Sequence, residues 1–229
     1  MGKVVGWLVV FALLVLGVGW IAQAESLRTI AGQFAPTLRQ ETCEFTTPDG
    51  QTLELSTQDA ARLTESIVNG RKKQVASFGP VAKSVDLTMP AAVTCTLPVP
   101  TGLAEQSIND NGLTPRTQRV LDAVLDEFGW VPTGGYAPGG IDYGHGSTSK
   151  HYSGLAVDFF FRPYTDPAMR AAGWEMANWL VAHAAAFDIE VLIFDDLIWS
   201  TNRSPQGWRD YVRRDGATDP VNRHLDHIH

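Results

Sequence analysis

Residues 149–158, SKHYSGLAVD, combine a histidine and an aspartate with small and apolar residues between them. His151 and Asp158 are separated by six residues, so the imidazole is expected at a loop end and the carboxylate on the following strand. Gly154 lets the chain turn tightly between them, because glycine has no Cβ and adopts left-handed backbone conformations readily. The two side chains can therefore converge on one cation.

A second motif, DHIH, occupies residues 226–229. Side chains alternate along an extended segment, so His227 and His229 project to the same face. Two nitrogen ligands and one carboxylate suit zinc, and three protein ligands leave a fourth position open for water, as in catalytic zinc sites. A single histidine of this kind would be read as an ordinary surface residue. Together, the two motifs predict a zinc site in a cleft.

The domain that carries both motifs is expected to span residues 113–229 and to contain two long helices. Thr114 is a helix N-cap followed by proline at the first helical position, and Gly129 ends that helix. Asp166, again followed by proline, opens a second helix that runs towards Ala186. Apolar residues recur at helical spacing in both segments.

A glycine-rich loop and several strands fill the rest of this domain. The loop spans residues 134–146, and three apolar segments have the length of strands: residues 155–161, 190–194 and 197–199. Helices and strands alternate without the regular repeat of a parallel, doubly wound fold. We therefore expect an α+β fold in which an antiparallel sheet packs against helices.

A small unit bracketed by cysteines precedes this domain. Cys43 and Cys95 are the only cysteines, and neither belongs to a CxxC pair, so a disulfide is the simplest interpretation in an oxidising compartment. The unit is expected to span residues 43–97, with linkers at residues 25–42 and 98–112.

Within this unit, residues 43–47 and 52–55 flank a Pro-Asp-Gly turn and predict a hairpin. Ser56 then caps a helix. Residues 75–94 are too irregular to assign, and no clustered titratable groups indicate chemistry in this unit.

The N-terminus indicates export. Residues 4–22 form an unbroken apolar run that is close to the length needed to cross a bilayer, and Lys3 is the only charge before it. Residues 22–24, Ala-Gln-Ala, also fit a signal-peptidase site. The segment 1–24 is therefore either a membrane anchor or a signal cleaved after Ala24, and both place the rest outside the cytoplasm. The net charge of −7 does not favour nucleic acid as a partner.

Residues 113–229 resemble the zinc peptidase superfamily that includes D-Ala-D-Ala carboxypeptidases, phage L-Ala-D-Glu endolysin peptidases and hedgehog domains. The stretch 149–158 matches that family's SxHxxGxAxD signature at every specified position. The whole segment is most similar to a C-terminal domain of exported actinobacterial proteins, which runs from a helix containing TPR through GGY and HxxGxAxD to DHxH.

The resemblance implies that His151, Asp158 and His229 are the zinc ligands. It implies that Asp226, three positions before the last ligand, is the general base, and that His227 sits beside the metal and orients the reacting water. The implied activity is hydrolysis of a peptide bond in peptidoglycan stem peptides, as carboxypeptidase or endopeptidase, outside the cytoplasmic membrane.

Tyr136 and Ser149 are candidate substrate-binding residues, although a glycine-rich loop also needs such groups to close over itself, and Ser149 is placed to cap it. Relatives usually carry an arginine after the tyrosine, where this sequence has Ala137. Three other arginines are available to take its role: Arg162, Arg203 and Arg209.

Two other functions remain open for this sequence. The first is a non-catalytic, zinc-containing module that binds the cell wall or a protein, which Ala137 favours. The second is a structural envelope protein that recruits partners through the unit at residues 43–97. Stoichiometric zinc would argue against the second, and turnover of muropeptides would argue against the first.

Overall fold

The computed structural model describes residues 41–212, 216 and 218–229, all of which belong to one compact unit that spans residues 39–229. The expected export segment and most of the linker at residues 25–42 lie outside the described residues. Within the part of the chain that is described, no helix has the length and apolar character of a membrane span.

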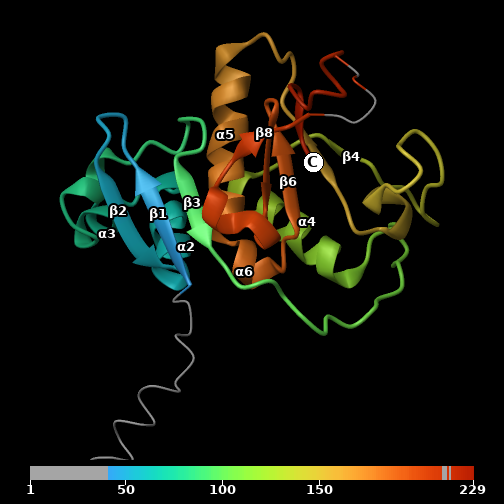
Figure 1. The fold of residues 1–229 in the computed structure, drawn as a ribbon, viewed down its shortest axis with the longest axis horizontal. Helices are drawn as coiled ribbons and strands as arrows, with labels where there is room; N and C mark the ends of the chain where they lie inside the picture. Colours follow the sequence, from blue (N-terminus) through green and yellow to red (C-terminus); the bar gives the residue numbers. More distant parts are fainter. Residues whose placement is uncertain (1–40, 213–215, 217) are drawn as a thin grey trace, which may run out of the picture. The chain divides into compact units, whose positions relative to one another are not determined.

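A three-stranded antiparallel sheet forms the N-terminal part of the fold (Figure 1). The predicted hairpin is confirmed as β1 (Thr42–Thr46) and β2 (Thr52–Ser56), and β3 (Val93–Thr96) pairs with the other edge of β1. Cys43 lies directly opposite Cys95 in this register, and the two form the predicted disulfide.

Helix α2 (Thr57–Val68) follows the hairpin as expected. The Ser56 hydroxyl caps it by accepting a hydrogen bond from the Asp59 backbone N–H, at 3.2 Å. The segment that could not be assigned from sequence holds helix α3 (Lys72–Ser77), a 3₁₀ turn η1 (Val81–Ser84) and strand β3.

Helix α5 (Pro167–Ala182) is buried along most of its second half and joins the N-terminal sheet to the rest of the unit. The fully buried Asn178 side chain accepts a hydrogen bond from Val93 N–H and donates to the carbonyls of Leu87 and Met89. One side chain thereby satisfies two carbonyls of the loop before β3 and the first N–H of the strand.

The two predicted long helices begin at their expected caps. In α4 (Pro115–Phe128), Thr114 accepts from Thr117 N–H, and Gly129, at φ +75°, ends the helix. Asp166 caps α5, but the expected continuation towards residue 186 is wrong. The chain breaks at His183, whose non-helical ψ of 1° separates α5 from the short helix α6 (Ala184–Phe187).

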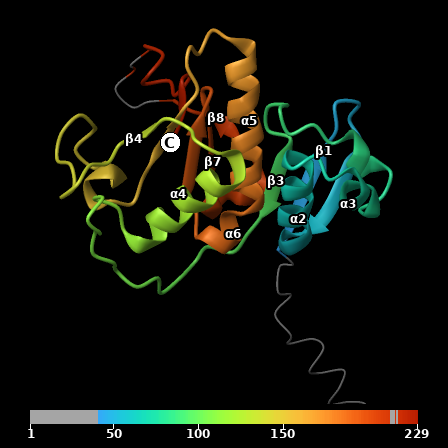
Figure 2. The ribbon, with the colours of Figure 1, turned by 180° about the vertical axis from the view of Figure 1, so that it is seen from behind.

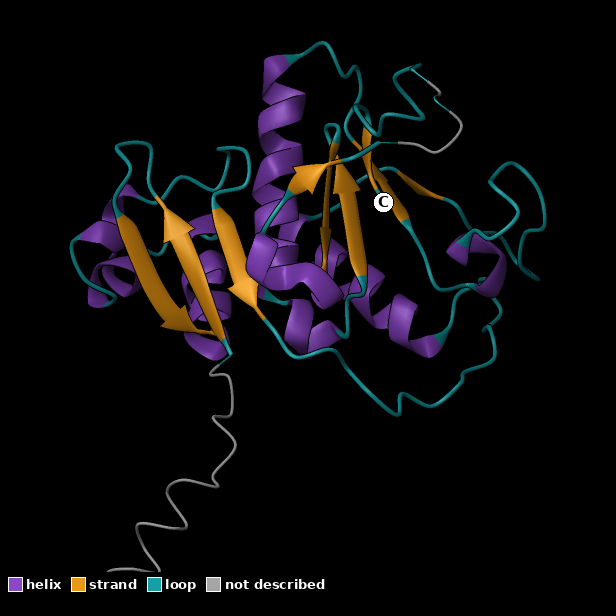
Figure 3. Ribbon diagram, viewed as in Figure 1, coloured by secondary structure: helices purple, strands orange, loops and turns teal. Residues whose placement is uncertain are grey.

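Two further three-stranded antiparallel sheets complete the α+β fold, as Figure 3 shows. One has the order β4 (Thr133–Gly134), β5 (Asp158–Phe160) and β9 (His227–Ile228). The other has the order β6 (Val191–Phe194), β7 (Leu197–Ser200) and β8 (Arg209–Asp210), with a 3₁₀ segment η3 (Thr201–Gln206) between β7 and β8.

The predicted strand at residues 155–161 is therefore shorter than expected. Leu155 N–H bonds back to the Lys150 carbonyl, so this end of the segment closes a turn instead of joining a sheet. The last residue of the chain bridges the two C-terminal sheets: His229 N–H donates to the Ile193 carbonyl, and Ile193 N–H donates to the His229 carbonyl. The C-terminus accordingly lies beside β6 in Figure 1, and in the view from behind its marker stands between the labels of β4 and β7 (Figure 2).

Candidate metal centre

His151, Asp158 and His229 meet at one point, although they are up to 78 residues apart in sequence. His151 Nε2 lies 3.0 Å from His229 Nδ1 and 3.3 Å from Asp158 Oδ1, and the latter two atoms are 3.1 Å apart. His151 and Asp158 are buried, and the side chain of His229 is 20% exposed. The triangle is therefore reached from solvent on the His229 side.

The triangle has the dimensions of a zinc site. Zinc–ligand bonds of about 2.0–2.1 Å at tetrahedral angles place ligand atoms about 3.3 Å apart, close to the three observed separations. Two imidazole nitrogens and one carboxylate oxygen are also a donor set that zinc accepts. Among the described residues, these three form the one such group of histidine, cysteine or acidic side chains.

Local backbone structure positions the first ligand. His151 lies in the 3₁₀ turn η2 (Lys150–Ser153), which Ser149 caps by accepting a hydrogen bond from His151 N–H at 3.3 Å. Gly154 ends the turn at φ +63°, the left-handed conformation expected from the sequence. The turn then delivers the chain to Asp158, the first residue of β5.

A second glycine makes room for the His151 ring. Gly135 follows β4 at φ +79°, and a Cβ on this residue would lie 2.2 Å from His151 Cε1 and 2.4 Å from His151 Nδ1. The ring therefore packs directly against main chain, and the same Cβ would also lie 3.1 Å from Asp158 Oδ2.

The DHIH segment is held by main-chain hydrogen bonds on both sides. Phe161 N–H donates to the Asp226 carbonyl at 2.8 Å, and Phe159 pairs with Ile228 in the register of β5 and β9. The bonds between His229 and Ile193 complete the opposite side. His229 is thus fixed by sheet pairing and not by the metal.

Electrostatics favour an ionised Asp158. Burial alone would raise the pKa of this carboxyl, but hydrogen bonds to His151 and His229, together with their charges, outweigh burial and hold the pKa well below its usual range. A carboxylate that is ionised in the absence of metal can bind a cation without first losing a proton.

Asp226 and His227 form a bonded pair next to the triangle. Asp226 Oδ1 lies 2.7 Å from His227 Nδ1, and the other carboxylate oxygen accepts a hydrogen bond from Arg162 Nε, also at 2.7 Å. Burial would raise the pKa of Asp226, but these contacts lower it overall. His227 Nε2 lies 4.0 Å from Asp158 Oδ1, so the ring spans the space between Asp226 and the triangle.

The two candidate substrate-binding residues make internal contacts. The Tyr136 hydroxyl is 2.9 Å from Thr133 Oγ1, and its ring packs against the core. Ser149 has the capping role described above, and it also lines a groove of about 830 Å³ that opens beside His229. Lys150 and Leu155 belong to the same groove, whereas Tyr136 does not.

Two histidines that the motifs do not include also contact the site. The His145 ring, from the glycine-rich loop, stacks on the His151 ring, with centroids 4.1 Å apart. The centroid of the His224 ring lies 4.7 Å from that of the His227 ring. Burial, followed by the charges of His227 and His229, lowers the pKa of His224 to about 3. The sequence gives little signal for His224, because it reaches the site through a left-handed backbone conformation, φ +53°.

His183, Arg203 and Arg209 lie elsewhere in the fold. His183 is bonded to the Trp179 carbonyl and to Glu65, at the end of α5. The Arg209 guanidinium donates to Ser200 Oγ and to the Arg203 carbonyl, so it is engaged around β7 and η3, and Arg203 lies in η3.

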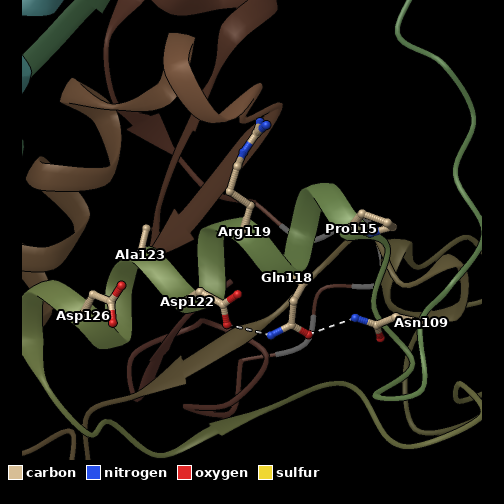
Figure 4. Close-up of a pocket in the computed structure, with 7 residues that line it drawn as sticks. All are labelled: Asn109, Pro115, Gln118, Arg119, Asp122, Ala123 and Asp126. Carbon is tan, nitrogen blue, oxygen red and sulfur yellow. Dashed lines mark hydrogen bonds between the residues drawn. The ribbon is translucent and has the colours of Figure 1, made fainter.

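A shallower pocket of about 470 Å³ lies on α4, where the Gln118 amide bridges Asn109 and Asp122 (Figure 4). It contains no predicted site residue among the side chains that line it.

Comparison with known proteins gives one match. Residues 109–221 match the family model described as VldE, C-terminal domain. The matched segment includes His151 and Asp158 and ends before the DHIH motif. No curated protein and no solved structure matches the chain.

Proposed function

We propose that this chain is a zinc-dependent peptidase that cleaves peptidoglycan stem peptides outside the cytoplasmic membrane. The observation that carries the proposal is the triangle of His151 Nε2, Asp158 Oδ1 and His229 Nδ1, with sides of 3.0–3.3 Å. These three residues would hold the ion. Of the three, His229 alone also lines the groove of about 830 Å³, which offers space for a substrate beside this ligand.

Two features support the proposed location. The Cys43–Cys95 disulfide is typical of proteins in oxidising compartments. The N-terminal sequence adds either an anchor over residues 4–22 or a signal cleaved after Ala24. In both cases the site would face peptidoglycan.

When bound, a zinc ion supplies Lewis acidity, which polarises a carbonyl group and makes water a nucleophile at neutral pH. The chain's own residues then have two tasks. The triangle holds one face of the site rigid, because each ligand is fixed by a turn or by sheet pairing. Side chains on the opposite face must accept a proton and return it.

His227 Nε2 is the atom best placed to accept that proton. Its other nitrogen, Nδ1, bonds to the Asp226 carboxylate, which fixes the tautomer with hydrogen on Nδ1 and leaves Nε2 free to accept. The sequence suggested Asp226 itself as the base. The lowered pKa of Asp226 and its bond to Arg162 instead favour His227 as the base, with Asp226 orienting the ring. The pair would then return the proton to the leaving amine of the substrate.

Zinc content and muropeptide turnover test the proposal together. Wild-type protein should bind one zinc per chain and release peptide or amino acid from purified muropeptides. Asp226→Asn should keep zinc but lose about 10²–10⁴-fold in kcat, because an amide can donate to Nδ1 and select the wrong tautomer. His151→Gln should lose the zinc. A wild type without stoichiometric zinc, or an Asp226→Asn variant with full activity, would refute the mechanism.

A non-catalytic binding module is the alternative, and one observation favours it. Ala137 stands where relatives of the zinc peptidase superfamily carry a cationic group. If the wild type binds zinc and muropeptides but cleaves them no faster than Asp226→Asn does, the binding module is correct.

A further inference from the structure

An ion pair between Lys150 and Glu190 lies in the groove that opens beside His229. Lys150 Nζ and Glu190 Oε2 are 3.0 Å apart, and their side chains are 53% and 70% exposed. Both residues line the groove together with His229. Lys150 directly precedes the ligand His151, and Glu190 directly precedes β6. The groove beside the candidate metal centre therefore contains an accessible cation next to an accessible anion.

The Lys150–Glu190 pair can be opened at little cost. In the described part of the chain, the Lys150 ammonium and the Glu190 carboxylate make no other hydrogen bond or ion pair. An ion pair this exposed contributes little to stability, because water screens both charges. A ligand that brings one opposite charge to each side chain would thus replace one weak ion pair with two.

Another ion pair of the same groove, Arg116 with Asp188, is held by further contacts. Arg116 Nε and Arg119 Nη2 both lie 3.5 Å from Asp188 Oδ2, and Arg116 Nη2 donates to the Ala104 carbonyl. The side chains of Arg116 and Asp188 are also less exposed than those of the first pair. These charges are committed to the fold, so the first pair is the one that a ligand can exchange.

Apolar residues lie beside the exchangeable pair. Leu155 N–H donates to the Lys150 carbonyl at 3.0 Å, which places Leu155 next to Lys150 in the turn. Leu155 is exposed and lines the groove, as does Val191, the residue after Glu190. Ligand sites combine apolar surface with a few polar groups that fix orientation. This part of the groove therefore suits a side chain with an aliphatic stem and opposite charges at its end.

The pair lies at a defined distance from the metal centre. Ile193, on β6, exchanges two main-chain hydrogen bonds with His229, and Glu190 lies three residues before Ile193. At a rise of about 3.3 Å per residue, this separation is about 10 Å along the strand. An extended substrate covers the same distance in about three residues. The pair would therefore contact a side chain near the cleaved bond and not the cleaved bond itself.

We propose that Lys150 and Glu190 select a substrate residue whose side chain ends in a zwitterion, with an amino group and a carboxylate on the same carbon. A diaminodicarboxylic acid in a stem peptide has this end and an aliphatic stem. The Lys150 ammonium binds its carboxylate, and the Glu190 carboxylate binds its ammonium. The proposal rests on the peptidase function proposed above and names the substrate class of that site.

The test uses the full chain loaded with zinc and two stem pentapeptides that differ only in the third residue. One carries meso-diaminopimelic acid, and the other carries the same residue with its side-chain carboxylate amidated. Wild type should have a KM about 10–100-fold lower for the free zwitterion, because the amide loses a charge-assisted contact with Lys150. Lys150→Gln should remove this preference with little change in kcat. Arg62→Gln, which breaks an exposed ion pair with Asp59 on α2, should preserve it.

Charge reversal separates recognition from a purely structural role. Lys150→Glu and Glu190→Lys should each abolish the preference, and the double variant should recover part of it, because a zwitterion can turn and exchange its two charges. Zinc content should stay at one ion per chain in all of these variants. A wild type without preference for the zwitterion, or variants that affect both pentapeptides equally, would overturn the proposal.

Calorimetric titration keeps this outcome separate from that of the proposed function. If wild type cleaves neither pentapeptide, the peptidase function fails, but binding of the same two peptides still tests the recognition by Lys150 and Glu190. Tighter binding of the zwitterion that Lys150→Gln abolishes supports the assignment. Equal affinity of wild type for the two peptides, or no binding of either, rejects it.

Discussion

Replacing Gly135 with alanine should displace His151 and weaken zinc binding without unfolding the protein. The new Cβ would lie 2.2 Å from His151 Cε1, whereas carbon atoms in contact prefer about 3.5–4.0 Å. The ring or the main chain must therefore move by about 1 Å or more. Metal sites tolerate deviations of only about 0.2 Å in their ligand distances, so this movement removes His151 Nε2 from the triangle.

The expected loss is at least about 100-fold in zinc affinity, since altering groups that merely orient ligands already costs about 10–100-fold. Alanine at φ +79° also adds backbone strain of about 1–2 kcal/mol, which must be separated from the clash. Gly139→Ala isolates the strain: Gly139 has φ +81° in the same loop, and a Cβ added there would have no neighbouring atom within 4 Å.

Competition with a chromophoric chelator gives the zinc affinity of wild type and both variants, and circular dichroism with thermal unfolding verifies that each is folded. Gly139→Ala should bind zinc like wild type but unfold at a slightly lower temperature. The reasoning is refuted if Gly135→Ala, folded, binds zinc as tightly as Gly139→Ala.

Three further predictions concern stability. Asn178→Leu should lower the free energy of unfolding by about 2–5 kcal/mol in chemical denaturation, because Val93 N–H and two carbonyls lose their partner. Reducing the Cys43–Cys95 disulfide, which closes a loop across 52 positions, should cost about 4 kcal/mol in the same assay. In zinc-free protein, burial lowers the pKa of His224 from its ordinary 6.5 to about 3 in the folded state. The unfolded chain therefore binds the proton more tightly, and the free energy of unfolding falls as the pH drops from about 6.5 towards 3. Asparagine tolerates the left-handed backbone at this position. Between pH 7 and pH 5, the free energy of unfolding of His224→Asn, measured by thermal unfolding, should therefore fall by about 1–2 kcal/mol less than that of the wild type.

Local signals in the sequence were enough to locate the helix starts and the hairpin. Thr114 and Asp166 act on the backbone within their own first turn, so the information needed is carried by adjacent residues. The end of α5 required more, because nothing at His183 resembles a helix stop. Its ring bonds to Glu65 of α2, and this partner cannot be predicted from local sequence because it lies 118 positions away.

Short strands were missed for the same reason. Strand β3 pairs with β1, with Cys95 opposite Cys43, and its four alternating residues, VTCT, are too few to identify a strand from sequence alone. The predicted strand at residues 155–161 was overextended, because the turn between Lys150 and Leu155 depends on one main-chain bond that apolar composition does not reveal.

Asp226 shows where prediction of the candidate site ends. Residue type and spacing predicted a metal site built from residues 149–158 and 226–229, and the family resemblance selected His151, Asp158 and His229, which the structure brings together. The resemblance also implied that Asp226 is the base, but the proton affinity of a carboxylate depends on its neighbours. His227 follows Asp226 directly in sequence, whereas Arg162 becomes its neighbour only through the fold, in which β5 pairs with β9. The expected ligand set thus came from residue type, spacing and resemblance, whereas the division of labour that we propose for Asp226 and His227 rests on contacts that only the fold reveals.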